Sequence, residues 1–414
     1  MKHIYIVDEH QSSKQNGVGT YIQQLLKCFE GSVHDVNLLS FNSDEKEFMV
    51  EHHSSYTEYH VPICGNRGFL QGGALSISLF RLYLTDNDDN VFIVNHFPCD
   101  KFVAVLKRHF PKSRIIFVIH DQGWCAPLLG DAELFKNILS SKYVPKDKRQ
   151  QWLQIRNITS SEKRAYRIVD DIIALSRTTY ELLQTIYHVP AGNIHLIPNG
   201  LQAPVSRLSE EERRATRRKL GIDDEEIVLL YTGRTTRSKG IIPLLQAFDR
   251  LWMEHPRLRL VIAGQVFTFN DFARQTPHSA AHVTYTGLLP KEQLAAWYQI
   301  ADIGILPSYT EQSSYTGIEM QAYGKLIVTT DGHNITDMFG EEEAVVAPIG
   351  EHRNEDYSVF VKSLEKAIQR ALMMTKEKRI ELCNKSYKRY CQMYSFDQWR
   401  LRYSHLFLQK VFEG

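Results

Sequence analysis

Several features that assign a chain to a common class are missing from this 414-residue sequence. Lys plus Arg (49) nearly equals Asp plus Glu (48), which excludes binding of nucleic acid through bulk charge. No stretch approaches the roughly 18 apolar residues that span a bilayer, and the N-terminal MKHIYIVDEH is too short an apolar run for a signal peptide. We therefore expect a cytoplasmic protein whose contact with a membrane, if any, is peripheral on the inner face.

Cysteine is also scarce, which bears on metal binding and on the redox compartment. The six cysteines form no Cys-x-x-Cys pair, and the spacing of histidines and cysteines suggests no zinc site. We expect buried, reduced thiols of a cytosolic protein. The cysteines are Cys28, Cys64, Cys99, Cys125, Cys383 and Cys391.

An alternation of short apolar runs with helical patterns, repeated twice along the chain, predicts an α/β fold with two domains. Near-continuous apolar runs are typical of a parallel sheet that is buried on both faces. In the first half the expected strands are 3–7, 36–40, 91–95, 114–119, 171–175 and 194–197, with helices near 18–29, 75–84, 100–109, 155–168 and 178–186. After Pro198-Asn199-Gly200 the expected strands are 227–231, 258–263, 283–285, 302–306 and 326–329, with helices at 240–254, 290–300 and 315–323 and a helical tail from 355.

Ligands of open α/β sheets bind beyond the carboxyl ends of the strands, so residues that follow strands are candidates. Asn16-Gly17-Val18-Gly19 follows the first expected strand and opens a helix, whose amides would point at a ligand. It is a poor dinucleotide fingerprint, and an ordinary loop is the alternative. His120-Asp121 ends the strand at 114–119. Its imidazole suits a substrate hydroxyl or a developing charge, or else it caps the next turn.

Charged residues follow two expected strands of the second half. Gly233-Arg234 follows 227–231 and Lys239-Gly240 begins the next helix, so the two cations bracket a helix N-terminus as at an anion site. Glu311 follows 302–306, and Glu319 comes after seven further residues, about one turn inside the next helix. Both carboxylates would face one ligand, with the amides of 314–316 open to a phosphate. Solvated turns and surface glutamates are the alternatives.

Taken in order, these motifs and Ile-Pro-Asn-Gly at 197–200 resemble the retaining family-4 glycosyltransferases (glycosyl transferases group 1) of the GT-B fold. The resemblance spans nearly the whole chain. It implies two Rossmann-like domains that face a cleft: residues 1–200 on the acceptor side and residues 201–390 for the nucleotide sugar. It also implies that residues 391–414 form a C-terminal helix that packs back on the first domain.

The resemblance also implies roles for individual positions. Arg234 and Lys239 would hold the donor diphosphate, and Glu319 would bind the ribose. The catalytic residues would be Glu311, beside the transferred sugar, and His120, bonded to a sugar hydroxyl. Further donor contacts would come from Gly17, Gly19, Ser314, Tyr315 and Thr316. The donor would be a nucleotide-diphosphate sugar, with a UDP-sugar favoured, and neither a cofactor nor a metal is expected.

An insertion at about 122–155 would shape the acceptor site, with Asp121 and Trp124 as contacts. The acceptor would be a saccharide, a lipid-linked saccharide or a peptide. Residues 142–167 carry eight Lys or Arg against two Asp or Glu; this is either a solvated helical face or a surface for an anionic acceptor or membrane. Two departures from the family pattern, Ser313-Ser314 for Phe-Gly and Gln202 for an acidic residue, bear on the donor rather than on the reaction.

Three alternatives stay open. A metal-dependent GT-A transferase needs an acidic pair on a loop, and Asp86-Asn87-Asp88 has that spacing, although Asx-rich turns arise freely. A UDP-sugar 2-epimerase uses a similar two-domain fold without an acceptor. A non-catalytic nucleotide-sugar sensor would be expected to lose some of Glu311, His120 and Lys239.

Overall fold

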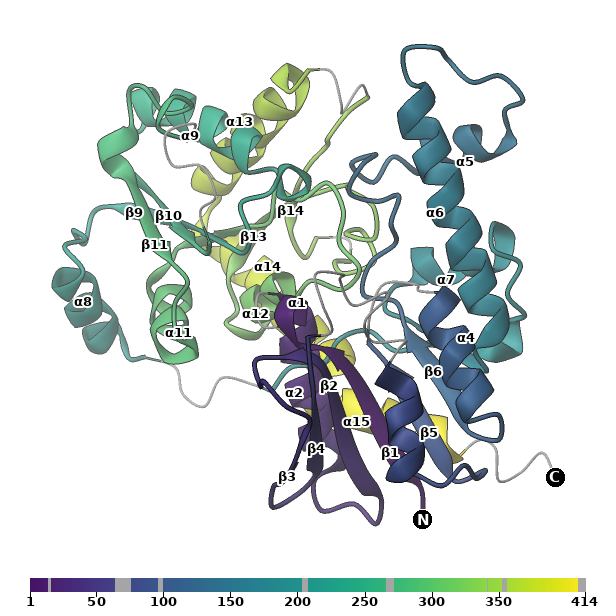
Figure 1. Cartoon of the computed structure of the whole chain (residues 1–414). Coiled ribbons are helices and arrows are strands. Elements are labelled where there is room, and N and C mark those ends of the chain that lie inside the picture. Colours follow the sequence, from purple (N-terminus) through teal and green to yellow (C-terminus); the bar gives the residue numbers. More distant parts are fainter. Residues whose placement is uncertain are drawn as a thin grey trace. The chain divides into compact units, whose positions relative to one another are not determined.

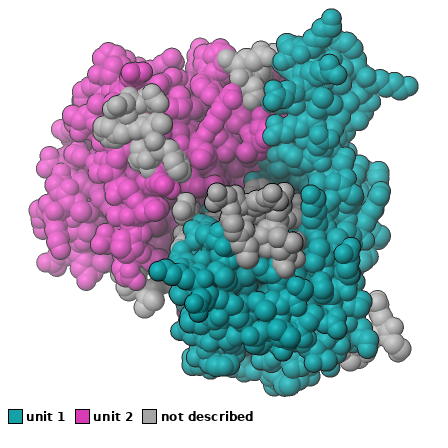
Figure 2. Space-filling model, in the orientation of Figure 1, with its two compact units in different colours: residues 1–125, 132–199, 400–414 teal, residues 126–131, 200–399 magenta. Residues whose placement is uncertain are grey.

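The protein is represented by a computed structural model that describes residues 1–13, 16–63, 76–95, 100–202, 208–265, 272–340, 342–351 and 356–408. The chain divides into two compact units (Figure 2). Unit 1 comprises residues 1–125, 132–199 and 400–414, and unit 2 comprises residues 126–131 and 200–399. The sequence predicts a boundary at 200, and the units divide between Asn199 and Gly200.

Unit 1 is built on a sheet that, within the described ranges, has eight strands in the order β3-β4-β2-β1-β5-β6-β7-β8. All neighbours are parallel except β3 and β4. The strands are β1 (His3–Glu9), β2 (Asp35–Ser43), β3 (Met49–His52), β4 (Thr57–Pro62), β5 (Asn90–Val94), β6 (Arg114–Val118), β7 (Asp171–Ala174) and β8 (Ile194–Leu196). Every residue of β5 and β7 is buried, because helices cover both faces of the sheet (Figure 1).

The helices of unit 1 connect these strands. They are α1 (His10–Ser13), α2 (Gly17–Phe29), η1 (Ile77–Leu82), α4 (Asp100–His109), α5 (Ala132–Ser140), α6 (Arg149–Ile168), α7 (Arg177–Thr185) and η2 (Ala191–Asn193). The last part of α15 (Phe396–Leu408) completes the unit. It packs on α2, since the Tyr403 hydroxyl bonds to that of Tyr21 and the ring of Phe407 lies 5.5 Å from the ring of Phe29.

Unit 2 has a parallel sheet in the order β11-β10-β9-β12-β13-β14 within its described residues. Its strands are β9 (Ile227–Thr232), β10 (Leu258–Ala263), β11 (Val283–Gly287), β12 (Ile303–Ile305), β13 (Leu326–Thr330) and β14 (Val345–Ala347). Its helices are α8 (Glu210–Lys219), η3 (Arg237–Lys239), α9 (Ile241–Glu254), η4 (Ala280–His282), α11 (Lys291–Ile300), α12 (Tyr315–Ala322), α13 (Ser358–Leu372), α14 (Lys376–Arg389) and the π-helix η5 (Tyr390–Tyr394).

Both sheets have the doubly wound order that creates a ligand-binding crevice. In unit 1 the chain goes from β1 to β2 on one side, while β5 lies on the other side of β1. In unit 2 the same reversal occurs at β9, which lies between β10 and β12. The carboxyl ends of β1 with β5, and of β9 with β12, are therefore the switch points at which such sheets bind ligands.

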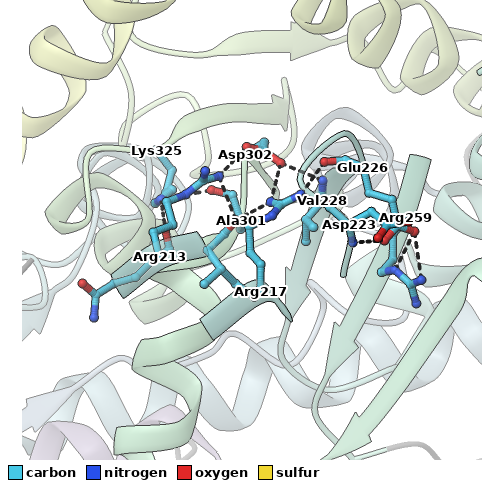
Figure 3. A network of polar contacts seen from close by, with 11 residues as sticks. Arg213, Arg217, Asp223, Glu226, Val228, Arg259, Ala301, Asp302 and Lys325 are labelled. Carbon is cyan, nitrogen blue, oxygen red and sulfur yellow. Dashed lines mark hydrogen bonds and ion pairs between the residues drawn. The ribbon is translucent and has the colours of Figure 1, made fainter. Parts of the chain in front are cut away.

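At the amino ends of the unit 2 strands, a polar network fastens α8 to the sheet (Figure 3). Arg217 is almost fully buried, and its guanidinium donates to the carbonyl oxygens of Ile300, Asp223 and Glu226 and to Asp302. The Asp302 carboxylate also accepts from Arg213 Nη2 at 2.6 Å and from the amide of Val228 at 2.8 Å. One carboxylate thus ties a helix to two strands.

The structure differs from the predicted elements where local pattern is weak. The sequence gives no apolar signal for β3 and β4, whose residues are largely polar, or for the three-residue β14. The charged segment near 206–219 contains the helix α8, which begins with a capping box between Ser209 and Glu212.

Cys28 and Cys125 are buried, but Cys391 is exposed, so the expectation of a buried thiol is wrong there. Cys64 and Cys99 lie outside the described residues.

The predicted break at Pro198-Asn199-Gly200 has a packing reason. A Cβ atom at Gly200 would lie 2.2 Å from Cβ of Trp399, so only glycine fits there. The predicted C-terminal segment, 391–414, is divided: residues up to Trp399 belong to unit 2 and residues from Arg400 belong to unit 1.

Candidate functional site

The carboxyl end of β9 presents an arginine to solvent. Gly233 and Arg234 follow the strand directly, and Arg234 is exposed. Its backbone carbonyl accepts from the Tyr231 hydroxyl at 2.5 Å, which fixes the position of the turn. No side chain in the described ranges of the structure pairs with the Arg234 guanidinium. A fixed backbone with an unpaired cation is suited to bind an anion.

Lys239 and Glu311, which the sequence motifs treat separately, form an ion pair. Lys239 Nζ lies 2.7 Å from Glu311 Oε1, which also accepts from Ser308 Oγ at 2.7 Å. Gly240 makes this approach possible: its φ is +66°, and a Cβ atom there would lie 1.9 Å from the carbonyl oxygen of Pro307. The turn after η3 and the loop after β12 are therefore in direct contact, and burial of the pair strengthens it.

The N-terminus of α12 lies on the same loop. Ser314 caps the helix, and its side chain accepts from the amide of Gly317 at 3.4 Å. The expectation that the Ser314 amide is open is wrong, because this amide points at Met338 Sδ, 3.3 Å away. Thr316 Oγ1 lies 3.1 Å from Thr232 Oγ1 and donates to the Thr232 carbonyl oxygen at 3.3 Å. The side chain of Tyr315 is half-buried.

Glu319 lies one turn into α12 and is held from α11. The hydroxyl of Tyr298 donates to Glu319 Oε2 at 2.6 Å, and it also lies 2.7 Å from Thr232 Oγ1. Burial raises the pKa of Glu319 to about 7, while the bond from Tyr298 and the charge of Lys291 lower it. Arg234, Lys239, Glu311, Thr316 and Glu319 thus lie on the segments that follow β9 and β12, at the switch point of unit 2.

In unit 1, His120 follows β6 and is fixed by two neighbours. Its Nε2 lies 3.1 Å from Asn95 Oδ1, and its ring meets the ring of Tyr21 edge to face with centroids 4.6 Å apart. Gly17 and Gly19 open α2, where Asn16 accepts from the amide of Val18 at 2.8 Å. These residues follow β1, β5 and β6, at the carboxyl ends of neighbouring strands.

The two predicted acceptor contacts, Asp121 and Trp124, differ in how far their side chains are buried. Trp124 is completely buried, and its ring stacks on the ring of Phe135 with centroids 4.3 Å apart and planes 6° apart. The assignment of Trp124 to an acceptor is therefore wrong, because its side chain is part of the core between the β6 loop and α5. Asp121 is half-buried, and its carboxylate accepts from the amide of Gln122 at 2.8 Å.

A buried glutamate on α6, which the motifs do not single out, holds the loop after His120. Glu162 is 1% exposed, accepts from the amide of Gly123 at 2.8 Å and bonds to the hydroxyl of Tyr187. Burial raises its pKa to about 7, against the effect of the two hydrogen bonds. The helical spacing of buried Ile155, Thr159 and Glu162 is a signal that could have revealed it.

Two other charged segments have structural partners. The carboxylate of Asp86 accepts from the amides of Lys112 and Ser113, at 3.1 and 3.2 Å, as a turn residue does. In the basic segment 142–167, Arg156 donates to the carbonyl oxygens of Ile138 and Ser141 and closes the end of α5. In the described part of the chain, no group of three or more His, Cys, Asp or Glu residues is arranged to hold a metal ion.

A search of the described helices for membrane spans finds none that is both long and apolar enough to cross a bilayer.

Comparison with known proteins identifies the family. The model described as Glycosyltransferase Family 4 matches residues 15–203, and the model described as Glycosyl transferases group 1 matches residues 212–388. Together they take in most of the chain, which belongs to the family-4 glycosyltransferases of the GT-B fold. The two doubly wound sheets are the two Rossmann-like halves of that fold.

Individual relatives are distant. The chain is 29% identical over 189 residues to the alpha-monoglucosyldiacylglycerol synthase of Streptococcus pneumoniae. The aligned region covers 44% of this chain and 42% of that protein. The chain spans about half the length of the curated relatives it matches, from 42% to 60% for four of them.

Solved structures share the fold over the whole length. Sucrose-phosphate synthase from Thermosynechococcus elongatus aligns with a TM-score of 0.76 and 19% identity, covering 100% of both chains. The Anabaena HepE protein in complex with UDP and glucose aligns with a TM-score of 0.69 and 14% identity, covering 98% of this chain and 99% of that one.

Proposed function

We propose that this chain transfers a sugar from a nucleotide-diphosphate sugar, a UDP-sugar, to an acceptor, with retention of the anomeric configuration and without a metal ion. One observation carries the proposal. At the switch point of unit 2, the exposed guanidinium of Arg234, the Lys239–Glu311 pair and the Glu319 carboxylate lie together. Two cations beside two carboxylates match the diphosphate and the hydroxyl groups of such a donor.

Arg234 and Lys239 bind the diphosphate in this proposal. Each cation forms charge-assisted hydrogen bonds with phosphate oxygens, which stabilises the charge that grows as the bond to the sugar breaks. Ser314, Tyr315 and Thr316 begin α12, whose N-terminus adds to the favourable field. With this charge supplied by side chains, a divalent cation is not needed. Gly17 and Gly19 at the start of α2 let the unit 1 backbone approach the donor.

Glu319 binds the ribose, which does not change during the reaction. Glu311 lies beside the transferred sugar, where positive charge develops at the anomeric carbon, and its carboxylate also fixes Lys239. His120, held by Asn95, bonds a hydroxyl of that sugar. Asp121 follows His120 and contacts the acceptor.

The reaction keeps the anomeric configuration because the acceptor attacks from the face that the diphosphate leaves. A bond forms between the acceptor oxygen and the anomeric carbon, and the bond from that carbon to the diphosphate oxygen breaks. The departing diphosphate oxygen takes the proton of the acceptor hydroxyl, so no covalent intermediate with the protein is formed.

Two similarities support the donor and the acceptor class. The HepE protein was solved with UDP and glucose, which supports a uridine donor. The similarity to a monoglucosyldiacylglycerol synthase supports a lipid or lipid-linked acceptor. The exposed cations Lys142, Lys146 and Arg149 near the α5–α6 turn suit an anionic headgroup.

The proposal is tested by binding followed by turnover. A thermal-shift screen of UDP-, GDP- and ADP-sugars identifies the donor, because a bound donor raises the melting temperature. Turnover is then measured with lipid and saccharide acceptors, with and without EDTA, and the anomeric configuration of the product is read by NMR. We expect a UDP-sugar to bind, activity to survive EDTA, and the configuration to be retained.

Other outcomes would overturn parts of the proposal. Loss of activity in EDTA with rescue by Mn²⁺ contradicts the metal-free mechanism. Release of UDP together with a 2-epimerised sugar, without transfer, identifies an epimerase. Tight donor binding with no turnover on any acceptor, and no hydrolysis, identifies a sensor.

A further inference from the structure

A continuous chain of hydroxyl groups in unit 2 ends on the carboxylate of Glu319. Thr316 Oγ1 donates to the Thr232 carbonyl oxygen at 3.3 Å and lies 3.1 Å from Thr232 Oγ1. Thr232 Oγ1 lies 2.7 Å from the hydroxyl of Tyr298, which in turn lies 2.6 Å from Glu319 Oε2. The chain links β9, α11 and α12, and the Tyr298 side chain is 1% exposed.

The number of protons available decides which hydroxyl group donates each hydrogen bond in this series. Each hydroxyl has one proton to donate, whereas an ionised carboxylate only accepts. When Glu319 is ionised, the Tyr298 hydroxyl donates its hydrogen bond to Glu319 Oε2. The hydroxyl of Thr232 then donates either to the phenol oxygen of Tyr298 or to Thr316 Oγ1. The Tyr298 hydroxyl is thus committed to Glu319, while Thr316 donates to the Thr232 carbonyl oxygen.

The consequence for Glu319 is a carboxylate with one end held. Oε2 is bonded to Tyr298, and Oε1 has no partner among the residues that the structure describes. The side chain is neither free to rotate nor fully satisfied. It can therefore accept hydrogen bonds from a ligand that presents hydroxyl groups at this point.

We propose that Tyr298 is a positioning residue that holds Glu319 as a fixed acceptor for the vicinal hydroxyls of the donor ribose, and thereby selects ribonucleotides over deoxyribonucleotides. This inference rests on the proposed use of a nucleotide-sugar donor. A site whose buried polar group is left unpaired by an analogue rejects that analogue strongly. A 2′-deoxy nucleotide lacks one of the two vicinal hydroxyls and therefore offers Glu319 one hydrogen bond fewer.

The surroundings of Glu319 make this selection depend on its charge. Tyr298 and Lys291 face it from α11, and Tyr323, at the end of α12, has its own pKa raised by burial and by the nearby Glu319 charge. Of these groups, Tyr298 and Lys291 favour the ionised carboxylate. Loss of the Tyr298 hydroxyl would therefore raise the pKa of Glu319 further above its present value of about 7.

The chain offers a matched control for this experiment. The rings of Tyr298 and Tyr323 stack with centroids 5.1 Å apart and planes 10° apart. Tyr323→Phe therefore removes a hydroxyl from the same pair of rings without touching the bond to Glu319. Thr232→Val, which interrupts the chain one step earlier, serves as a second test if Tyr298→Phe folds poorly.

The experiment measures dissociation constants of the nucleoside diphosphate that binds best and of its 2′-deoxy form, by calorimetry. We expect wild type and Tyr323→Phe to prefer the ribonucleotide by about tenfold or more, the usual effect of a hydrogen bond to a charged group. In Tyr298→Phe this preference falls severalfold, and in Thr232→Val it falls less. Melting temperatures check that each variant is folded.

A pH series with the intact sugar nucleotide separates positioning from a merely structural role. Ionised Glu319 is the form that binds, so donor affinity of wild type rises with pH through about 7. In Tyr298→Phe the midpoint moves to higher pH, and in Tyr323→Phe it does not. In steady-state assays Tyr298→Phe raises donor KM with little change in kcat, because the ribose is unchanged by the reaction.

Three outcomes would overturn the inference. If a folded Tyr298→Phe keeps both the ribose preference and the pH midpoint of wild type, Tyr298 does not position Glu319. If Tyr323→Phe changes them equally, the stacked rings rather than the hydroxyl are responsible. If wild type binds no nucleoside diphosphate, the proposed function fails and the inference fails with it; binding without ribose preference overturns the inference alone.

Discussion

The polar networks at the two ends of the unit 2 sheet differ in how many of their charged groups have hydrogen-bond partners within the protein. At the amino ends, the buried guanidinium of Arg217 is bonded through both terminal nitrogens to Asp302 and to three carbonyl oxygens (Figure 3). At the carboxyl ends, the guanidinium of Arg234 is exposed and has no partner in the described ranges, and Glu319 has one oxygen bonded. Both networks use arginine and carboxylate, but the chain itself satisfies the first far more fully.

This difference is what we expect between a network that stabilises the fold and a network that a ligand would complete. A buried charge without a partner is costly, so the Arg217 network contributes mainly by avoiding that cost. An exposed cation without a partner lowers the free energy of unfolding only slightly, so Arg234 is available to bind an anion. Substitutions at the two ends should therefore affect different measurements.

The largest effect is expected for Asp302→Ala. The substitution leaves Arg217 buried without its carboxylate and removes the acceptor of the Val228 amide. Breaking a buried pair in this way costs about 3–5 kcal/mol. Urea unfolding should show this loss, while nucleotide affinity at low urea stays near wild type. A change below about 1 kcal/mol, typical of exposed ion pairs, would mean that the network does not stabilise unit 2.

A pair of arginine substitutions sharpens the comparison directly. Arg234→Ala should raise donor KM by about 10- to 100-fold, since it removes charge-assisted bonds to phosphate, and change stability by less than about 0.5 kcal/mol. Arg213→Ala should leave donor KM unchanged and lower stability by about 1 kcal/mol, because Arg213 pairs with Asp302 at a partly exposed position. Steady-state kinetics and urea unfolding of both variants provide the test. If both change the same quantity, the division between the two ends is incorrect.

A double-mutant cycle on Lys239 and Glu311 tests the ion pair inside the site. Lys239 is paired with Glu311 in the structure, so under the proposed function a diphosphate has to compete with Glu311 for Lys239. Glu311→Gln should therefore bind free nucleoside diphosphate more tightly, by severalfold, and lower kcat, whereas Lys239→Ala should weaken binding. The coupling between the two should be about 1–2 kcal/mol in nucleotide binding. Additive effects would show that the 2.7 Å contact has no energetic consequence.

The last prediction concerns a buried carboxylate in unit 1, Glu162, for which the described residues provide no cation partner. Its folded-state pKa is raised to about 7, so the native state holds a proton that the unfolded state releases between about pH 4.5 and 7. This contribution to stability is present at pH 4.5 and is lost as the pH rises through 7. Glu162→Gln removes the titrating group, so relative to wild type it should be more stable at pH 8 than at pH 5. Thermal melts at both values test this; an equal difference at both would contradict it.

The fold followed from the sequence wherever a strand is buried on both faces. The runs at 91–95, 114–119 and 171–175 overlap β5, β6 and β7, because a central parallel strand must be apolar along its whole length. β3 and β4 escaped prediction, since their polar residues gain strand structure only by pairing with each other and with β2.

For the candidate site, positions could be predicted but contacts could not. Arg234, Lys239, Glu311 and Glu319 were found because each follows a strand or begins a helix. The bond between Lys239 and Glu311 joins residues 72 positions apart, and no local pattern encodes it. Trp124 was misassigned because its nearness to His120 in sequence says nothing about the direction of its side chain, which Phe135 on α5 determines.

The division of the chain into units has a consequence for its synthesis. Unit 1 receives its last segment, from Arg400 onward, only after all of unit 2 has been made. Until then the Tyr21 hydroxyl and the ring of Phe29 on α2 lack Tyr403 and Phe407. Residues 126–131 of unit 2, by contrast, are synthesised early and have no partners in unit 2 until residues 200–399 follow. Folding on the ribosome usually completes the N-terminal domain first, but here unit 1 is completed only after residues 200–399 of unit 2 have been synthesised.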